Sequence, residues 1–295
     1  MKKSLKTHIT PGKEILFIDQ IKKYIKDKYI NLEALSNINQ LFIETRNNLT
    51  TDQVNDIVAA YAEIEVINPT FLFKELYPFI LKNQSSLTLQ SQIKISHLFA
   101  KKDFYSERFC QQLVSNFTGS SETLSSSELI DLQWSLNKIR YFDQNFFQEW
   151  KNTIIPHVRD LGNHDLTKSV LAVAKNDYFS EDLIRQFVNT LKERELDDHN
   201  LVNAIYGLSL IMTTKNQEYL QEDIYELLVK VNPSTISAAS EKRQLISSYN
   251  SLSASYKNNL NNIYSKLNNW SEELRKEAQV TIIPFLVINY TNYLA

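Results

Sequence analysis

The sequence has few of the residues that make tight turns or cross-links. Of its 295 residues, only four are Gly, six are Pro and one, Cys110, is Cys. A single cysteine cannot form a disulfide within the chain and fits a reducing compartment. The scarcity of Gly and Pro argues against folds built on many tight turns and favours long helices joined by short connections.

Long apolar runs are also missing. No run approaches the roughly 20 apolar residues of a membrane-spanning helix. The nearest run, Val280 to Ile288, is too short and contains Pro284. The N-terminus has no apolar signal core. Its first 13 residues hold several Lys, Ser and Thr residues and no acid, a composition that suggests an organellar targeting segment although it has no Arg.

One short phrase is present three times at a spacing of 37 residues. It reads Lys101–Tyr105, Lys138–Phe142 and Lys175–Phe179, in each case a Lys followed three and four residues later by two aromatic residues. Each copy joins an apolar-periodic stretch to a helix-capping residue that opens a second one: Ser106, Asp143 and Ser180. A fixed period of this length, made of two amphipathic stretches, predicts an α-helical repeat array.

Five repeats are predicted between residues 49 and 230. Each opens with a Leu that is followed by cap-prone residues: Thr50-Thr51, Thr88, Ser125-Ser126-Ser127, Asn163 and Asp197-Asp198. A short side chain lies thirteen residues after each Leu: Ala62, Ala100, Asn137, Ala174 and Ser209. A short side chain there allows close approach of neighbouring helices. The second helix of the first four repeats begins at Asn68, Ser106, Asp143 and Ser180 and has an apolar stripe at intervals of four residues.

The two ends are predicted to cap this array. Residues 1–48 form a basic N-terminal cap with helices over about 13–29 and 32–44. Residues 231–295 form a degenerate sixth repeat, opened by Asn232-Pro233-Ser234, and C-terminal docking helices, the last of which begins at Ser271. We therefore expect an all-α protein, an α-solenoid of about five to six two-helix repeats of about 37 residues.

No residue pattern indicates catalysis, a metal or a cofactor. No two of the five His residues stand at the spacing that places two ligands on one helix face. Thr10-Pro-Gly-Lys13 lacks the first Gly and the spacing of a phosphate-binding loop. Cys110 lies on an apolar helix face and is expected to be buried rather than nucleophilic. We therefore expect a protein that is not an enzyme.

Charge is unevenly distributed, and it supplies the candidate binding residues. The net charge is −2, but residues 1–30 have a balance of +5 and residues 31–230 a balance of −9. Eight lysines form the basic arm: Lys2, Lys3, Lys6, Lys13, Lys22, Lys23, Lys26 and Lys28. The repeated Lys101, Lys138 and Lys175 form a second set, which would either follow a phosphate backbone or complement helix C-termini.

The repeated pattern resembles the heptatricopeptide and octotricopeptide repeats, relatives of the helical arrays in FAST-kinase-like proteins. The resemblance covers about residues 49–230 and is carried by the phrases that begin at Ala62, Ala100, Asn137 and Ala174. It implies an organellar protein that acts in RNA stability, RNA processing or ribosome assembly. The chain has no recognisable RAP domain, which such proteins commonly have, and its array is acidic.

These features favour a structural or adaptor protein of an organellar RNA-containing assembly, such as the mitochondrial ribosome. The basic arm would contact RNA, and the acidic array would receive a basic protein partner. One alternative is an RNA-binding repeat protein that uses Lys101, Lys138 and Lys175. Another is a scaffold in a complex without RNA. The expected location is mitochondrial, with a plastid-type organelle or the cytoplasm as alternatives.

Overall fold

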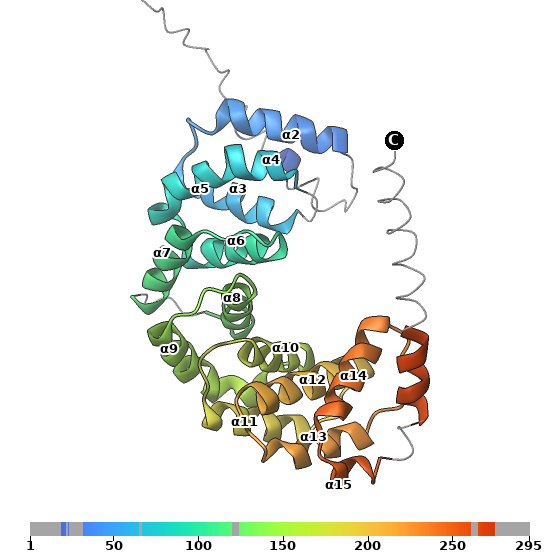
Figure 1. The fold of residues 1–295 in the computed structure, drawn as a ribbon. Helices are drawn as coiled ribbons and strands as arrows, with labels where there is room; N and C mark the ends of the chain where they lie inside the picture. Colours follow the sequence, from blue (N-terminus) through green and yellow to red (C-terminus); the bar gives the residue numbers. More distant parts are fainter. Residues whose placement is uncertain are drawn as a thin grey trace, which may run out of the picture. The chain divides into compact units, whose positions relative to one another are not determined.

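The fold was obtained as a computed structural model, which describes residues 19–21, 23, 32–64, 67–119, 124–260 and 265–274. These residues form helices that pack side by side, and no strand occurs among them (Figure 1). The all-α prediction is therefore confirmed. The chain divides into two compact units, residues 1–149 (unit 1) and 150–295 (unit 2). The predicted boundaries at 48 and 230 stay a prediction.

In unit 1, helices that are separated along the chain by other helical segments pack side by side. Its described helices are α2 (Leu32–Thr45), α3 (Thr51–Glu63), α4 (Pro69–Phe71), η1 (Leu72–Leu76), α5 (Tyr77–Asn83), η2 (Gln84–Ser86), α6 (Leu89–Lys101), α7 (Glu107–Thr118), α8 (Ser126–Lys138) and the start of α9 (Gln144–Ile154). Helix α6 packs against both α3 and α8, and α7 packs on α6 (Figure 1).

Unit 2 has the same arrangement of alternate helices. Its described helices are the end of α9, η3 (Ile155–Asp160), α10 (Asn163–Ala174), α11 (Glu181–Lys192), α12 (Asp198–Thr214), α13 (Leu220–Val229), α14 (Ala239–Ser251) and α15 (Ala254–Lys257), and residues 265–274 are also helical. Helix α12 packs against α10 and α14, and α13 packs on α12 (Figure 1).

The helix starts follow the predicted capping residues closely. Side-chain oxygens of eight residues accept a backbone N–H of the first turn, which satisfies donors that a helix start leaves unpaired. They are Thr50, Asn68, Thr88, Ser106, Ser125, Asp143, Ser180 and Asp197. Helix α10 differs from the prediction: its cap is Gly162, and Asn163 is its first helical residue.

The predicted apolar stripes and short side chains are buried as expected. The stripe residues of the second helices are at most 7% exposed: Leu72, Leu76, Ile80, Phe109, Leu113, Phe117, Phe146, Trp150, Ile154, Leu183, Phe187 and Leu191. Of the five short side chains, Ala100, Asn137, Ala174 and Ser209 are buried, whereas Ala62 is half-buried. These positions place small side chains where helices contact one another.

The stretch after Asn68 is helical but irregular, and a proline explains why. A π-helical turn, η1, separates α4 from α5. Pro78 lies at the second position of α5 and has no N–H to donate to the preceding turn, and its ring crowds the carbonyl four residues earlier. A wider turn relieves this clash. It places Phe73 and Lys74 at the surface.

The C-terminal part of the chain departs most from the prediction. Helix α14 begins at Ala239 rather than at Asn232-Pro233-Ser234, because the Asn232 side chain accepts the backbone N–H of Ser234 and forms a turn. Residues 265–274 form one helical segment that runs through Ser271, so the expected helix start at Ser271 is wrong. Among the described residues, no helix is long and apolar enough to cross a membrane.

Candidate interaction surface

The turns that follow α6 and α8 place the first two copies of the repeated phrase at one edge of unit 1. Asp103 and Arg140 have left-handed backbones, with φ of 50° and 61°. The next residues, Phe104 and Tyr141, each donate a backbone N–H to a carbonyl five residues earlier, at 2.8 and 2.9 Å. This is the Schellman ending of a helix, which satisfies carbonyls of the last turn. Both turns therefore direct an aromatic pair away from a helix end.

An aromatic cluster forms where η1 meets the first of these turns. The centre of the Phe104 ring lies 5.0 Å from the ring centre of Phe73, 4.9 Å from that of Tyr77 and 4.7 Å from that of Phe99. All three are edge-to-face contacts. The Tyr77 hydroxyl lies 2.7 Å from the Ser106 hydroxyl that caps α7. Phe99 is buried and Phe104 half-buried, but Phe73 remains 45% exposed and Tyr105 50% exposed.

The second turn, which contains Tyr141, lies beside the first. Burial raises the pKa of its hydroxyl to about 12, and the nearby charges of Asp143, Tyr105 and Glu107 add to the effect. The Tyr105 hydroxyl also has a raised pKa, from partial desolvation and the charge of Glu107. The 2.9 Å ion pair between Lys138 of the second turn and Asp103 of the first shows that the two turns lie side by side. We call Phe73, Phe104, Tyr105 and Tyr141 the aromatic edge.

Several exposed cations lie close in sequence to the rings of the aromatic edge. Lys74, Lys101, Arg108 and Arg140 are exposed and lie within three residues in sequence of an edge ring. Lys138 forms an ion pair of 2.9 Å with Asp103 of the preceding turn. The carboxylates within three residues of an edge ring are Glu75, Asp103, Glu107 and Asp143. Glu75 is paired with Arg46, and Asp143 accepts the backbone N–H of Phe146 to cap α9.

The predicted lysine set Lys101, Lys138 and Lys175 falls into different environments. Lys101 is exposed and Lys138 is ion-paired, both in unit 1. Lys175 is exposed in unit 2, at the C-terminal end of α10. The third copy of the phrase also turns differently, because the Asn176 side chain accepts the N–H of Tyr178 and no left-handed residue is present there. The structure brings Lys101 and Lys138 to one edge.

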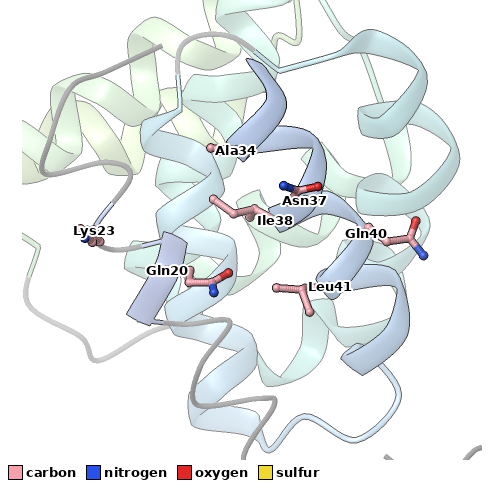
Figure 2. A pocket seen from close by; sticks show the side chains of 7 residues that line it. All are labelled: Gln20, Lys23, Ala34, Asn37, Ile38, Gln40 and Leu41. Atoms are coloured by element: carbon pink, nitrogen blue, oxygen red, sulfur yellow. The ribbon is translucent and has the colours of Figure 1, made fainter. Parts of the chain in front are cut away.

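Most of the predicted basic arm lies outside the described residues, namely Lys2, Lys3, Lys6, Lys13, Lys22, Lys26 and Lys28. Lys23 is described and exposed, and it lines a groove of about 550 Å³ on α2. Figure 2 shows the groove between Gln20 and Lys23 on one side and the α2 side chains Asn37, Ile38 and Leu41 on the other. The groove is lined by the aliphatic side chains of Ala34, Ile38 and Leu41 and by the amides of Gln20, Asn37 and Gln40.

A smaller cavity of about 280 Å³ lies in unit 2, between the turn before α14, α14 itself and the helical residues 265–274. Lys242 dominates its chemistry: the Nζ lies 5.6 Å from the centre of the Trp270 ring and 3.5 Å from a Glu273 carboxylate oxygen. Lys266 and Asn269 also line it. Because Lys242 is already held by a ring and a carboxylate, Lys266 supplies the remaining charge of the cavity lining.

Metal-binding groups and nucleophilic side chains are the remaining candidates for a chemical site. Within the described part of the chain, no group of three or more His, Cys, Asp or Glu residues could hold a metal ion. Cys110 is buried on α7, as predicted, and burial raises the pKa of its thiol to about 12. A thiol with this pKa carries almost no thiolate at neutral pH, so it is a poor nucleophile.

The exposure of Phe73 and Tyr105 was not predicted from the sequence. For Phe73 a signal was available, since Pro78 inside a helical pattern predicts an irregular turn. No comparable signal marks Tyr105. The chain matches no protein-family model, and the search of curated proteins likewise gave no match.

Proposed function

We propose that the chain is a non-catalytic helical-repeat adaptor of an organellar RNA-containing assembly, with the mitochondrial ribosome or its assembly as the first candidate. One observation carries the repeat-array part of the proposal. Hydrogen bonds between neighbouring helix pairs join residues that are separated by about one predicted period. Examples are Asn55 with Thr88, Tyr77 with Ser106, Thr167 with Asn200 and Lys215 with Asp177, separated by 33, 29, 33 and 38 residues.

This offset supports the predicted α-solenoid because each helix pair then contacts the next pair along the chain. Such arrays present extended surfaces to other macromolecules. The aromatic edge and its cations are a surface of that kind in unit 1. The RNA-containing assembly is proposed from the resemblance to heptatricopeptide and octotricopeptide repeats and from the basic arm, whose balance is +5 over residues 1–30.

The experiment is size fractionation of a native extract, with the chain followed by immunoblot, in low and high salt and with or without ribonuclease. The proposal predicts migration in a large particle that shrinks after ribonuclease treatment. A large particle that is insensitive to ribonuclease and salt would instead support a protein scaffold without RNA. Migration as a free monomer would contradict every adaptor proposal. Co-fractionation with purified mitochondria tests the proposed location.

The second candidate is an RNA-binding repeat protein that uses Lys101, Lys138 and Lys175. The exposure of Lys101 and Lys175 favours it, whereas the ion pair of Lys138 with Asp103 reduces the charge available to a phosphate. Charge reversal separates the candidates. Replacing these three lysines by Glu abolishes RNA binding only if they contact RNA. Replacing the lysines of the basic arm abolishes it only if the arm does.

A further inference from the structure

Contacts between η1 and the turn after α6, and between the turns after α6 and α8, bring together segments that carry two half-exposed rings and four exposed cations. We propose that this edge binds an extended acidic protein segment, in which an aromatic or large aliphatic side chain is flanked by carboxylates. The inference deepens the proposed adaptor function by naming the chemistry of a protein partner, and it rests on that function. It differs from the expectation that an acidic surface of the array receives a basic partner.

The rings supply the apolar part of the surface. Phe73 is 45% exposed and Tyr105 50% exposed, and they are two of four large hydrophobic residues in the described chain with such exposure. The Phe73 ring contacts Phe104, which in turn contacts buried Phe99. The exposed ring is therefore held by rings beneath it and is ordered before a partner arrives. Ordered aromatic side chains bind with a small loss of conformational entropy and commonly dominate interface energetics.

The charges around the rings select an acidic partner. Lys74, Lys101, Arg108 and Arg140 are exposed, and Lys138 already has a carboxylate partner in Asp103. Glu75 is paired with Arg46, and Glu107 and Asp143 are the remaining carboxylates within three residues of an edge ring. The surroundings therefore keep a positive balance within a chain of net charge −2. A partner with carboxylates near these cations gains charge-assisted hydrogen bonds, and Arg can form them in pairs.

The same observations favour a protein over single-stranded RNA. RNA carries a phosphate at every nucleotide, so a strand crossing this edge would bring phosphates near Asp103, Glu107 and Asp143. A peptide can place carboxylates opposite the cations and uncharged residues opposite the acids. Base stacking also needs an open ring face, and the half-buried Phe104 has neighbouring rings on several sides. Exposed aromatics beside Arg are typical of protein interfaces.

The test is a selection of random phage-displayed peptides on the purified full-length chain, followed by fluorescence-anisotropy titration of a selected peptide. The test variants are Phe73→Ala with Tyr105→Ala, and Lys101→Glu with Arg140→Glu. The matched controls are Val229→Ala, which removes another exposed apolar side chain, and Arg243→Glu, which reverses an exposed cation on α14. Circular dichroism melting confirms that each variant is folded.

We expect selected peptides with Asp or Glu flanking Phe, Trp or Leu, and an affinity that falls at least about tenfold in both test variants but not in the controls. Affinity should also fall with salt. Selection of no acidic peptide, or of peptides that bind the test variants equally well, overturns the inference. Oligouridine binding that is lost in the test variants, without acidic-peptide binding, assigns the edge to RNA. Because none of these readouts depends on particle size, they are independent of the adaptor test.

Discussion

Unit 1 and unit 2 stack alternate helices in the same way, but they fill the space between helices differently. In unit 1, Phe42 packs edge-on against Tyr61, Phe71 and Phe79, with ring centres 5.0 to 5.6 Å apart. In unit 2, α10 and α12 approach closely at Gly207, where a Cβ atom would lie 2.8 Å from a Val170 methyl carbon. The first contact is filled by aromatic rings, and the second is close because position 207 has no side chain.

Buried polar side chains form hydrogen bonds in both units. In unit 2 the buried Thr167 hydroxyl donates to the Asn200 side-chain oxygen at 2.9 Å, and Ser169 and Ser209 each donate to a carbonyl four residues earlier in their own helix. In unit 1 the Tyr61 hydroxyl donates to Asn39 at 3.0 Å, beside the ring cluster. The comparison teaches that stacked helices can pack either around large rings or at a close contact over a small residue, with hydrogen-bonded polar side chains nearby in both cases.

The largest expected effect is the loss of a central ring in unit 1. Phe42→Ala removes a fully buried side chain that contacts three other rings, and the surrounding helices cannot close the cavity completely. We expect the free energy of unfolding to fall by about 3–5 kcal/mol. Urea denaturation followed by circular dichroism measures it. Phe73→Ala, at an exposed ring, is the control, and an equal loss in both would contradict the assigned core.

The second largest expected effect on stability comes from adding one methyl group to the core of unit 2. Gly207→Ala places a Cβ against Val170 and the backbone of Leu171, so α10 and α12 must separate. Overpacking outweighs the better helix propensity of Ala, and we expect a net destabilisation of about 1–2 kcal/mol. Gly162→Ala is the matched control, because a Cβ there meets nothing within 4 Å. Denaturation midpoints that are equal for the two variants would disprove close packing at Gly207.

Two capping serines, one in each unit, extend the comparison between unit 1 and unit 2. Ser106 and Ser180 cap α7 and α11 in the same way, but only the Ser106 hydroxyl also lies within hydrogen-bond distance of a tyrosine, Tyr77. Replacement by Ala is expected to destabilise by about 1 kcal/mol at Ser180 and by about 1.5–2 kcal/mol at Ser106. Equal losses in thermal melts would mean that the bond to Tyr77 adds nothing to stability.

The smallest effect concerns the ion pair between neighbouring turns. Lys138 and Asp103 are 42% and 75% exposed, so solvent and salt screen their attraction. A double-mutant cycle with Lys138→Met and Asp103→Asn should give a coupling of at most about 0.5 kcal/mol in low salt, and less in high salt. A coupling that persists in high salt would contradict the exposed geometry.

Much of this fold could be predicted from the sequence because its signals are local. A capping Ser, Thr, Asp or Asn before an apolar stripe predicts a helix start, and the stripe predicts the buried face, as at Ser106 with Phe109. The prediction failed where local signals compete. Asn232 forms a turn instead of starting a helix, and Pro78 introduces a π turn.

The candidate surface was harder to predict. The sequence placed Lys101 and Lys138 in equivalent positions, and the structure brings them to one edge, but the bond of Lys138 to Asp103 depends on contacts between turns. The exposure of Tyr105 likewise depends on which face of a turn meets the next helix. A periodic pattern defines positions along the chain and leaves such contacts unspecified.

The proposed repeat array implies that each helix pair is stabilised by its immediate neighbours. Hydrogen exchange with mass spectrometry on the full-length Gly207→Ala chain is the most direct test of this. We predict faster amide exchange in α10, α12 and α14 and unchanged exchange in α3 and α6, because destabilisation in an array stays local. A uniform increase over all described helices would contradict this prediction and indicate a single cooperative core.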